Sequence, residues 1–301
     1  MPKSSAADPA PVQNITAGIL LRIGAMVCMA GMFAMVKWSS GRGVPVFETL
    51  FFRSAFAFVP LGLYIARTSG PSILWTTRPV AHLTRAAVGL TGMIGSFTAV
   101  SHLPLTEATA LSFSAPLFMT ALSALILHER VGRHQWAAVA VGFVGVLIMI
   151  RPDPVHMASI GAVFALIGAV GSAGAMIAIR QIGQTEPGPR IVFYFTLAGA
   201  VLGLASLPFG WVMPDTLTLG LLVLSGLLGG VGQLLLTQAV RVAPIAAIAP
   251  FDYTQLLWAS LIAYAVWGDL PRPSTLLGAG VVAASGLYIV YREASLARRG
   301  D

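Results

Sequence analysis

The chain has 301 residues, of which 56% are hydrophobic and only 10% are charged, and its mean hydropathy is +0.83. Because soluble domains carry about 25% charged residues, this composition excludes a soluble globular protein and predicts an integral membrane protein. The formal charge of +7 does not indicate nucleic-acid binding, since in a membrane chain Lys and Arg report on which side a loop lies.

Ten apolar runs are long enough for helices that cross a bilayer, which need roughly 20 residues. In chain order they cover residues 16–37, 46–66, 84–102, 105–127, 135–150, 160–180, 191–210, 217–240, 244–267 and 275–291. These runs are longer than β-barrel strands and lack their period of two, so the sequence predicts an all-α fold. The first run is too long for a signal peptide, and Cys28, the only cysteine, lies within it and excludes an intramolecular disulfide.

The distribution of Lys and Arg predicts that both termini are cytoplasmic, because cytoplasmic loops carry an excess of these residues. With the N-terminus inside, the inside segments hold twelve of them and the outside loops hold four. The twelve are Lys3, Arg67, Arg78, Arg85, Arg130, Arg133, Arg180, Arg190, Arg241, Arg292, Arg298 and Arg299; the four are Lys37, Arg42, Arg151 and Arg272. The short loops and tails fit a bacterial inner membrane.

The second half of the chain repeats the first. Residues 18–37, GILLRIGAMVCMAGMFAMVK, align with residues 161–180, GAVFALIGAVGSAGAMIAIR, at an offset of 143. Residues 89–104, GLTGMIGSFTAVSHLP, align with residues 229–244, GGVGQLLLTQAVRVAP, at an offset of 140. Each half then holds five helices, and an odd number makes the second half enter the membrane from the opposite side.

Inverted repeats of this kind are a common plan of secondary transporters, with the substrate site at the midplane between the halves. The expected organisation is a tail at 1–15, a first five-helix repeat at 16–152, an inverted second repeat at 153–293, and a tail at 294–301. Both tails are expected to be cytoplasmic, and a central cavity is expected between the repeats.

The end of the fourth run and the fifth run, LHERVGRHQWAAVAVGFVGVLIMIRP (127–152), have a second copy in WGDLPRPSTLLGAGVVAASGLYIVYRE (267–293). A proline opens the fourth helix, small residues fill its middle, and a glutamate ends it. This pattern resembles the EamA-type permeases of the drug/metabolite transporter superfamily, over essentially the whole chain. The resemblance implies ten helices in two inverted halves around a central cavity, and among exporters of the superfamily it favours the aromatic amino-acid branch.

The fourth and ninth helices carry polar residues and a proline at the same depth, Ser112, Ser114 and Pro116 in one and Asp252, Thr254 and Pro250 in the other. An interior proline removes a hydrogen-bond donor and bends the helix. In lipid the freed carbonyl must find a partner or face a water-filled cavity. The sequence therefore predicts two kinked helices beside a cavity, with ordinary kinks satisfied by neighbouring hydroxyls as the alternative.

Asp252 is the carboxylate nearest the midplane, and intramembrane charges are functional-site hypotheses by default. The alternative is a structural hydrogen bond to Gln255 or to a tyrosine. The candidates for the substrate cavity are Met93, Ser96, Ser112, Phe113, Pro116, Gln233, Asp252, Tyr253, Gln255 and Trp258.

Three further charged residues, Lys37, Glu48 and Arg53, are candidates for an outer gate or an ion pair. Glu48 and Arg53 are roughly 140 degrees apart around a helix and do not face each other, so Lys37 is the predicted partner of Glu48. Arg22 is expected to reach the inner membrane surface, as long cationic side chains do near helix ends.

These features predict alternating-access transport, by export or facilitated exchange, of a small organic solute. The leading candidate for the cargo is an amino acid with an aromatic or apolar side chain. A vitamin, nucleoside or drug-like metabolite is the alternative cargo, and a passive channel or membrane enzyme is a third reading. The chain lacks the H-E-x-x-H and G-x-S-x-G patterns of enzymes, so no catalytic residue, metal or other cofactor is expected. The expected partners are the solute and the lipid bilayer, with protons as one option for the coupling ion through Asp252. The sequence leaves the oligomeric state open.

Overall fold

The structure is a computed structural model that describes residues 14–68, 70–126, 132–150, 160–183, 185–243 and 248–297, and these residues form helices and no strand. The α-helices are α1 (Ile15–Gly41), α2 (Val46–Thr68), α3 (Pro79–His102), α4 (Leu105–Ser112), α5 (Ala115–Ile126), α6 (Arg133–Ile150), α7 (Ile160–Ile182), α8 (Gly188–Ala205), α9 (Thr216–Val242), α11 (Thr254–Trp267) and α12 (Pro273–Ala297). Three 3-10 helices join them: η1 (Pro71–Leu74), η2 (Leu207–Phe209) and η3 (Ala249–Tyr253).

Nine segments of the described chain are long and apolar enough to cross a membrane, with α4 and α5 together forming one of them. The tenth predicted span, 244–267, is seen as η3 and α11, while residues 244–247 lie outside the described residues. Large apolar side chains such as Leu63 and Leu147 are exposed on the surface of the bundle, where they would meet lipid. The all-α membrane fold predicted from composition is confirmed.

Several predicted boundaries differ from the structure by a few residues, and the difference at the end of the seventh run has a clear cause. The seventh run was expected to extend to residue 210, whereas α8 ends at Ala205 and η2 follows it. Pro208 lies in the first turn of η2, and a proline cannot donate the hydrogen bond that would continue α8. Gly210 then takes a positive φ of 91°, which glycine tolerates, and the chain turns toward α9.

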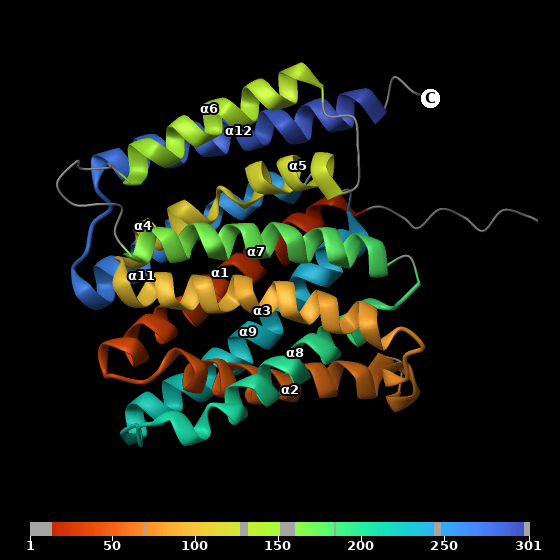
Figure 1. Ribbon diagram of the computed structural model, residues 1–301, viewed down its shortest axis with the longest axis vertical. Coiled ribbons are helices and arrows are strands. Elements are labelled where there is room, and N and C mark those ends of the chain that lie inside the picture. The colour runs from red at the N-terminus through yellow and green to blue at the C-terminus, as the bar shows by residue number, and fades with distance from the viewer. Residues whose placement is uncertain are drawn as a thin grey trace, which may run out of the picture.

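The helices lie side by side across Figure 1, from α6 and α12 at the top to α2 and α8 at the bottom. The most extensive packing joins α3 to α7, α1 to α9, α6 to α12, α2 to α9 and α2 to α8. In the sequence repeat α1 corresponds to α7, and α3 corresponds to α9. Exchanging the two halves therefore converts the α1–α9 pair into the α7–α3 pair. The pairs α2–α8, α6–α12 and α4–α11 each join two corresponding helices and stay unchanged. The packing therefore has an internal two-fold pattern; the repeat boundaries at 152 and 153 stay a prediction.

Helices α3 and α7 touch backbone to backbone where glycines face each other. A Cβ atom on Gly92 would lie 2.8 Å from the carbonyl carbon of Gly171, and one on Gly95 would lie 2.7 Å from the nitrogen of Gly168. Real Cβ atoms do not approach backbone this closely, so only glycine fits at these crossings. Small residues at helix interfaces are the usual means of close packing in membranes.

The fourth membrane segment is broken into α4 and α5 at its middle, as the proline predicted. At the break, the nitrogen of Phe113 donates to Ala110 O at 3.2 Å and the nitrogen of Ser114 donates to Leu111 O at 3.1 Å, three residues back instead of four. The Ser114 hydroxyl donates to Leu111 O at 2.7 Å. Pro116 has no N–H for the carbonyl of Ser112, which leaves that carbonyl without its helical donor.

The second broken segment meets the first. The 3-10 helix η3 contains Pro250 in its first turn and changes into α11 at Thr254. The ring of Tyr253 packs edge-on against the ring of Phe113, with the ring centres 5.0 Å apart. These two residues are equivalent in the sequence repeat, and equivalent residues of two copies can touch only close to the axis that relates them. The two breaks therefore lie together at the centre of the two-fold pattern.

Candidate functional site

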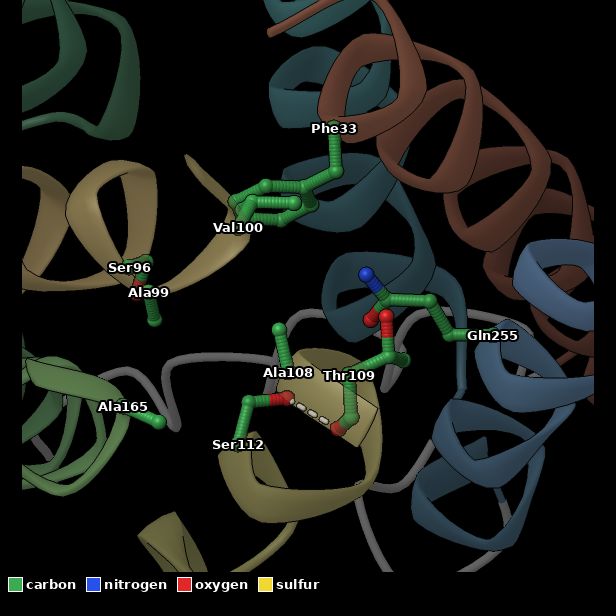
Figure 2. Close-up of a pocket in the computed structure, with 9 residues that line it drawn as sticks. All are labelled: Phe33, Ser96, Ala99, Val100, Ala108, Thr109, Ser112, Ala165 and Gln255. Atoms are coloured by element: carbon green, nitrogen blue, oxygen red, sulfur yellow. Dashed lines mark hydrogen bonds between the residues drawn. The ribbon is translucent and has the colours of Figure 1, made fainter. Parts of the chain in front are cut away.

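A small cavity lies beside the two helix breaks, with a volume of about 20 Å³ open to the centres of water-sized spheres. Five helices supply its walls: α1, α3, α4, α7 and α11 (Figure 2). The lining residues are Phe33, Ser96, Ala99, Val100, Ala108, Thr109, Ser112, Ala165 and Gln255. That volume holds about one water molecule and is far below the roughly 300–1,000 Å³ of small-molecule pockets, so any solute requires the helices to move apart.

Three of the four polar lining residues, Thr109, Ser112 and Gln255, come from α4 and α11, while Ser96 lies on α3 (Figure 2). Ser112 donates its hydroxyl to Thr109 O at 2.6 Å, and Thr109 in turn donates its hydroxyl to Leu105 O at 2.7 Å. The amide of Gln255 points from α11 toward Thr109 across the space (Figure 2). Small side chains and the ring of Phe33 form the remaining walls. The cavity can thus offer an amide and hydroxyl oxygens to a polar group and an apolar wall to the rest of a solute.

Lys37 lies near one end of this cavity, at the C-terminus of α3. Its ammonium donates to Leu103 O at 2.8 Å and to Val100 O at 3.5 Å, and it lies 5.9 Å from the centre of the Trp267 ring. The last carbonyls of a helix carry partial negative charge, which explains why the ammonium binds there. Lys37 therefore joins α1 to the end of α3 beside the cavity wall formed by Val100.

An ion pair in the membrane joins α1 to the second broken segment. Arg22 donates from Nε and from Nη2 to the two carboxylate oxygens of Asp252, in the bidentate arrangement that is the strongest geometry for this pair. The Arg22 side chain is 14% exposed and that of Asp252 is 37% exposed. Asp252 lies in η3, three residues before the cavity residue Gln255.

This pair corrects two expectations from the sequence. Arg22, expected to reach the inner membrane surface without a protein partner, binds the carboxylate of Asp252 instead. The alternative in which Asp252 hydrogen-bonds Gln255 or a tyrosine is not what the structure shows, since the carboxylate oxygens accept from Arg22.

The structure divides the predicted cavity residues into two groups. Ser96, Ser112 and Gln255 line the cavity. The others lie outside its lining: the helix breaks hold Phe113, Pro116, Asp252 and Tyr253, the neighbouring core holds Met93 and Trp258, and α9 holds Gln233. Sequence reasoning missed the other six lining residues, which carry no signal of their own because aromatic, aliphatic, hydroxyl and small residues are common in membrane helices: Phe33, Ala99, Val100, Ala108, Thr109 and Ala165.

The predicted pairing of Lys37 with Glu48 is wrong. Glu48 is 1% exposed, and its Oε2 accepts from the backbone nitrogen of Val212 at 3.0 Å. Lys37 instead binds the carbonyls that end α3, because these acceptors are close to its own helix. Arg53 pairs with neither of them, as the spacing from Glu48 predicted, and lies over the ring of Phe195.

At the opposite end of the bundle, Glu186 holds the α2–α3 connection against the start of α8. Its Oε2 accepts from Arg190 Nη1 at 2.6 Å and lies 3.4 Å from His82 Nε2, while its Oε1 accepts from the Thr76 hydroxyl at 3.1 Å. Tyr194 adds a bond from its hydroxyl to Leu74 O at 3.0 Å. The described residues hold no group of three His, Cys, Asp or Glu side chains that could bind a metal ion.

We expect acid to weaken this connection through Glu186. Burial raises the pKa of its carboxyl, but hydrogen bonds from Arg190, Thr76 and His82 outweigh burial and hold the pKa below its usual value. A lowered pKa contributes stability that is present above the unfolded value, about 4.3, and is lost as pH falls through the folded value. Thermal unfolding of wild type and Glu186→Gln between pH 7 and pH 3.5 should show a deficit for the variant that shrinks toward acid; a deficit independent of pH would contradict the assignment.

The comparisons with known proteins give the family. The model of the EamA-like transporter family matches the chain twice, over residues 16–151 and 159–292. The pseudopaline exporter CntI of Pseudomonas aeruginosa (strain UCBPP-PA14) is 32% identical over 88% of this chain and 92% of its own length. The S-adenosylmethionine uptake transporter of Rickettsia bellii is 30% identical over 82% and 84% of the two chains. A riboflavin transporter of Rhizobium johnstonii is 28% identical over 92% and 91%.

A solved crystal structure agrees in fold, with a TM-score of 0.65 at 18% identity over 92% of this chain and 98% of the other. At that identity the likeness concerns the fold alone. The two family matches together cover nearly the whole chain, and the relatives are transporters in membranes. This multi-pass membrane protein belongs to the EamA-like transporter family.

Proposed function

We propose that this transporter carries an amino acid or a small amino-acid derivative, with an apolar or aromatic body, by alternating access across a bacterial inner membrane. The observation that carries the proposal is the Arg22–Asp252 ion pair at the helix break, three residues from the cavity. A zwitterion brings one carboxylate and one ammonium, and these two charges complement Arg22 and Asp252. The bound zwitterion would replace the ion pair with two new pairs and leave neither charge unpaired.

The surroundings of the cavity support the apolar part of the proposal. Phe33 lines the cavity, while Phe113, Tyr253 and Trp258 pack in the core beside it. Aromatic rings give a large contact area to an apolar side chain of a solute. The relative that takes up S-adenosylmethionine is named for a substrate built on an amino acid, which agrees with a zwitterion site.

The broken helices supply the moving parts of the proposed cycle. Helices with unwound middles recur at transporter sites that alternate between the two sides of the membrane. Breaking the Arg22–Asp252 pair would free η3 from α1. Separately, loss of the Lys37 bonds would free α1 from the end of α3. We assign these two contacts as the closures on either side of the cavity, with both chain termini in the cytoplasm.

Counterflow in proteoliposomes tests the cargo. Vesicles loaded with unlabelled phenylalanine should accumulate labelled phenylalanine from outside, transiently and saturably, because exchange needs only the loaded carrier to reorient. Empty vesicles and vesicles with the Asp252→Asn variant are the controls, and the assay detects a carrier whether its natural direction is export or uptake.

The same vesicles distinguish an amino-acid carrier from a carrier of the alternative cargo. Accumulation of labelled riboflavin or of a nucleoside with no response to phenylalanine would overturn the amino-acid assignment and favour a vitamin or nucleoside carrier. Linear, non-saturating flux without acceleration by internal solute would indicate a passive channel instead.

A further inference from the structure

Two arginines lie buried in the bundle without a carboxylate partner. Arg53 of α2 is 4% exposed and Arg85 of α3 is 5% exposed. Neither forms an ion pair with any of the residues that the structure describes. The Nε of Arg53, and the Nε and Nη1 of Arg85, are buried and find no hydrogen-bond acceptor there.

The two guanidinium groups converge on one ring. The guanidinium carbons of Arg53 and Arg85 lie 5.8 Å and 4.3 Å from the centre of the Phe195 ring of α8. The hydroxyl of Ser54, beside Arg53 in the chain, is also buried without a partner, and it lies 2.5 Å from where a Cβ on Gly199 of α8 would stand. Four atoms of α2 and α3 that can donate hydrogen bonds, three guanidinium nitrogens and one hydroxyl, thus lie without a hydrogen-bond partner beside α8.

Glycines make the room for both side chains near the middle of the membrane. Gly229 is the central residue of α9, and a Cβ there would lie 3.1 Å from Arg53 Nε. Gly89 is close to the centre of α3, and a Cβ there would collide with Nη1 of Arg85. The two glycines are equivalent in the sequence repeat, at an offset of 140. Unlike Gly92 and its contacts with α7, they therefore accommodate cationic side chains and not a neighbouring helix backbone.

Two unpaired cations at this depth are expensive to keep. A buried charge without a partner is among the costliest features in a protein interior, and two like charges near each other add repulsion. Cation–π contact with Phe195 offsets only part of that cost. Charged residues inside membrane bundles pair with one another or mark a substrate or ion path. Here no opposite charge from the described chain does the pairing, which points to an anion from outside the chain.

We propose that Arg53 and Arg85 form a binding site for an oxyanion, a carboxylate or phosphate group supplied either by the transported solute before it reaches Arg22 or as a free anion. A guanidinium offers parallel N–H donors that match two oxygens of such a group. The Ser54 hydroxyl is a further donor within the same region. A site built from two forks discriminates planar and tetrahedral oxyanions from a chloride ion, which has no second oxygen to bind.

The site is connected to the cavity along one face of α3. Arg85, Gly89, Met93, Ser96 and Val100 follow at spacings of four, four, three and four residues, which places them on one side of a helix. Met93 packs both on the cluster that contains Phe195 and on the cluster that contains Phe97. A flexible thioether side chain is therefore the partition between the oxyanion site and Ser96 in the cavity wall.

Anion-dependent stability of the purified full-length protein tests the site without relying on transport. Sodium phosphate or sodium acetate is titrated against sodium chloride at constant ionic strength, and the melting temperature is followed by intrinsic tryptophan fluorescence. We expect a saturable rise with the oxyanion, at least tenfold weaker apparent affinity in Arg53→Gln and Arg85→Gln, and a wild-type response in Arg67→Gln, an exposed arginine of the same helix α2. No saturable rise in wild type, or unchanged affinity in both site variants, overturns the proposal.

Lysine variants test the oxyanion site even if the glutamine variants of Arg53 and Arg85 fail to fold. Arg53→Lys and Arg85→Lys retain the charge and lose the fork, so oxyanion affinity should still fall at least threefold while the response to chloride stays unchanged. Equal affinity of the lysine variants and wild type for phosphate and acetate would overturn the site.

Counterflow distinguishes the two sources of the oxyanion, the transported solute and a free anion. If the solute supplies it, phosphate or acetate outside the vesicles raises the apparent KM of the solute, and the rise disappears in Arg53→Lys. If a free anion supplies it, the KM is unaffected while the stability response persists. Absence of counterflow with an intact stability response would count against the proposed cargo and not against the oxyanion site.

Discussion

Replacing Asp252 with asparagine will abolish counterflow and destabilise the protein, because the change leaves Arg22 in the membrane without its counter-ion. Removing one partner of a fully buried ion pair costs about 3–5 kcal/mol. The Asp252 side chain is 37% exposed, so water screens part of that loss and we expect about 2 kcal/mol. Arg22→Gln should have a similar effect, since it leaves the carboxylate unpaired instead.

The double variant Arg22→Gln/Asp252→Asn separates the structural effect from the functional one. With both charges removed, no unpaired ion remains, so its stability should exceed that of either single variant; the double-mutant cycle measures this coupling. Counterflow should stay absent in all three variants if the charges bind the solute. A double variant that transports at the wild-type rate would show that the pair is structural.

The ion pair also changes what is expected of proton coupling. A lone carboxylate at position 252 could carry protons by itself, and Asp252→Asn would then remove pH-driven flux and spare exchange. With Arg22 bound to it, the same substitution unbalances the pair and exchange is expected to fall as well. Loss of pH-driven flux with intact exchange would restore the role of Asp252 as a simple proton site.

Substituting Gly92 with leucine will prevent the packing of α3 on α7 and reduce the yield of folded protein. The new side chain would start 2.8 Å from the backbone of Gly171, and backbone cannot rotate away as a flexible side chain can. Overpacking a core costs about 1–3 kcal/mol, and a clash with backbone belongs at the upper end or beyond. Fluorescence-detected size exclusion in detergent, followed by a melting curve, measures both the yield and the stability.

Gly220→Ala is the matched control for that substitution. Gly220 lies in α9, and a Cβ there meets no atom within 4 Å. Alanine is favoured over glycine inside a helix by about 1 kcal/mol, so the control should be as stable as wild type or slightly more so. A Gly92→Leu protein with wild-type melting temperature would mean that α3 and α7 can separate without loss.

The sequence was sufficient for the features that depend on local patterns. Apolar runs gave the membrane segments, since the bilayer thickness sets their length. Pro116 and Pro250 indicated the two broken segments, since an interior proline removes a helical hydrogen bond, although Pro60 leaves α2 unbroken. The repeat aligned Phe113 with Tyr253, and the structure brings these two rings into contact. Ser96, Ser112 and Gln255 were placed in the cavity wall because polar residues stand out against an apolar background.

Long-range pairing and exact helix ends could not be predicted. Arg22 and Asp252 are separated by 230 residues, and no local pattern joins them. Arg85 was counted with the charges of the inner loops because the third helix was expected to begin at residue 84. The helix begins at Pro79, so Arg85 lies more than a turn inside it, and its side chain extends along α3 to Gly89. The five-residue error in the predicted start of α3 therefore placed Arg85 among the loop charges, although its side chain is buried in the core.

The crosswise pairing of the halves has a consequence for biogenesis. The main partner of α1 is α9, and about 200 residues separate the starts of these helices. At a synthesis rate of roughly 5–20 residues per second, the ribosome needs roughly 10–40 seconds between them. During that interval α1 sits in lipid, or against an insertase, with Arg22 far from any Asp252 to neutralise it. The helix α1 therefore meets its main partner only after the first half of the chain has been synthesised, so this packing forms late in biogenesis.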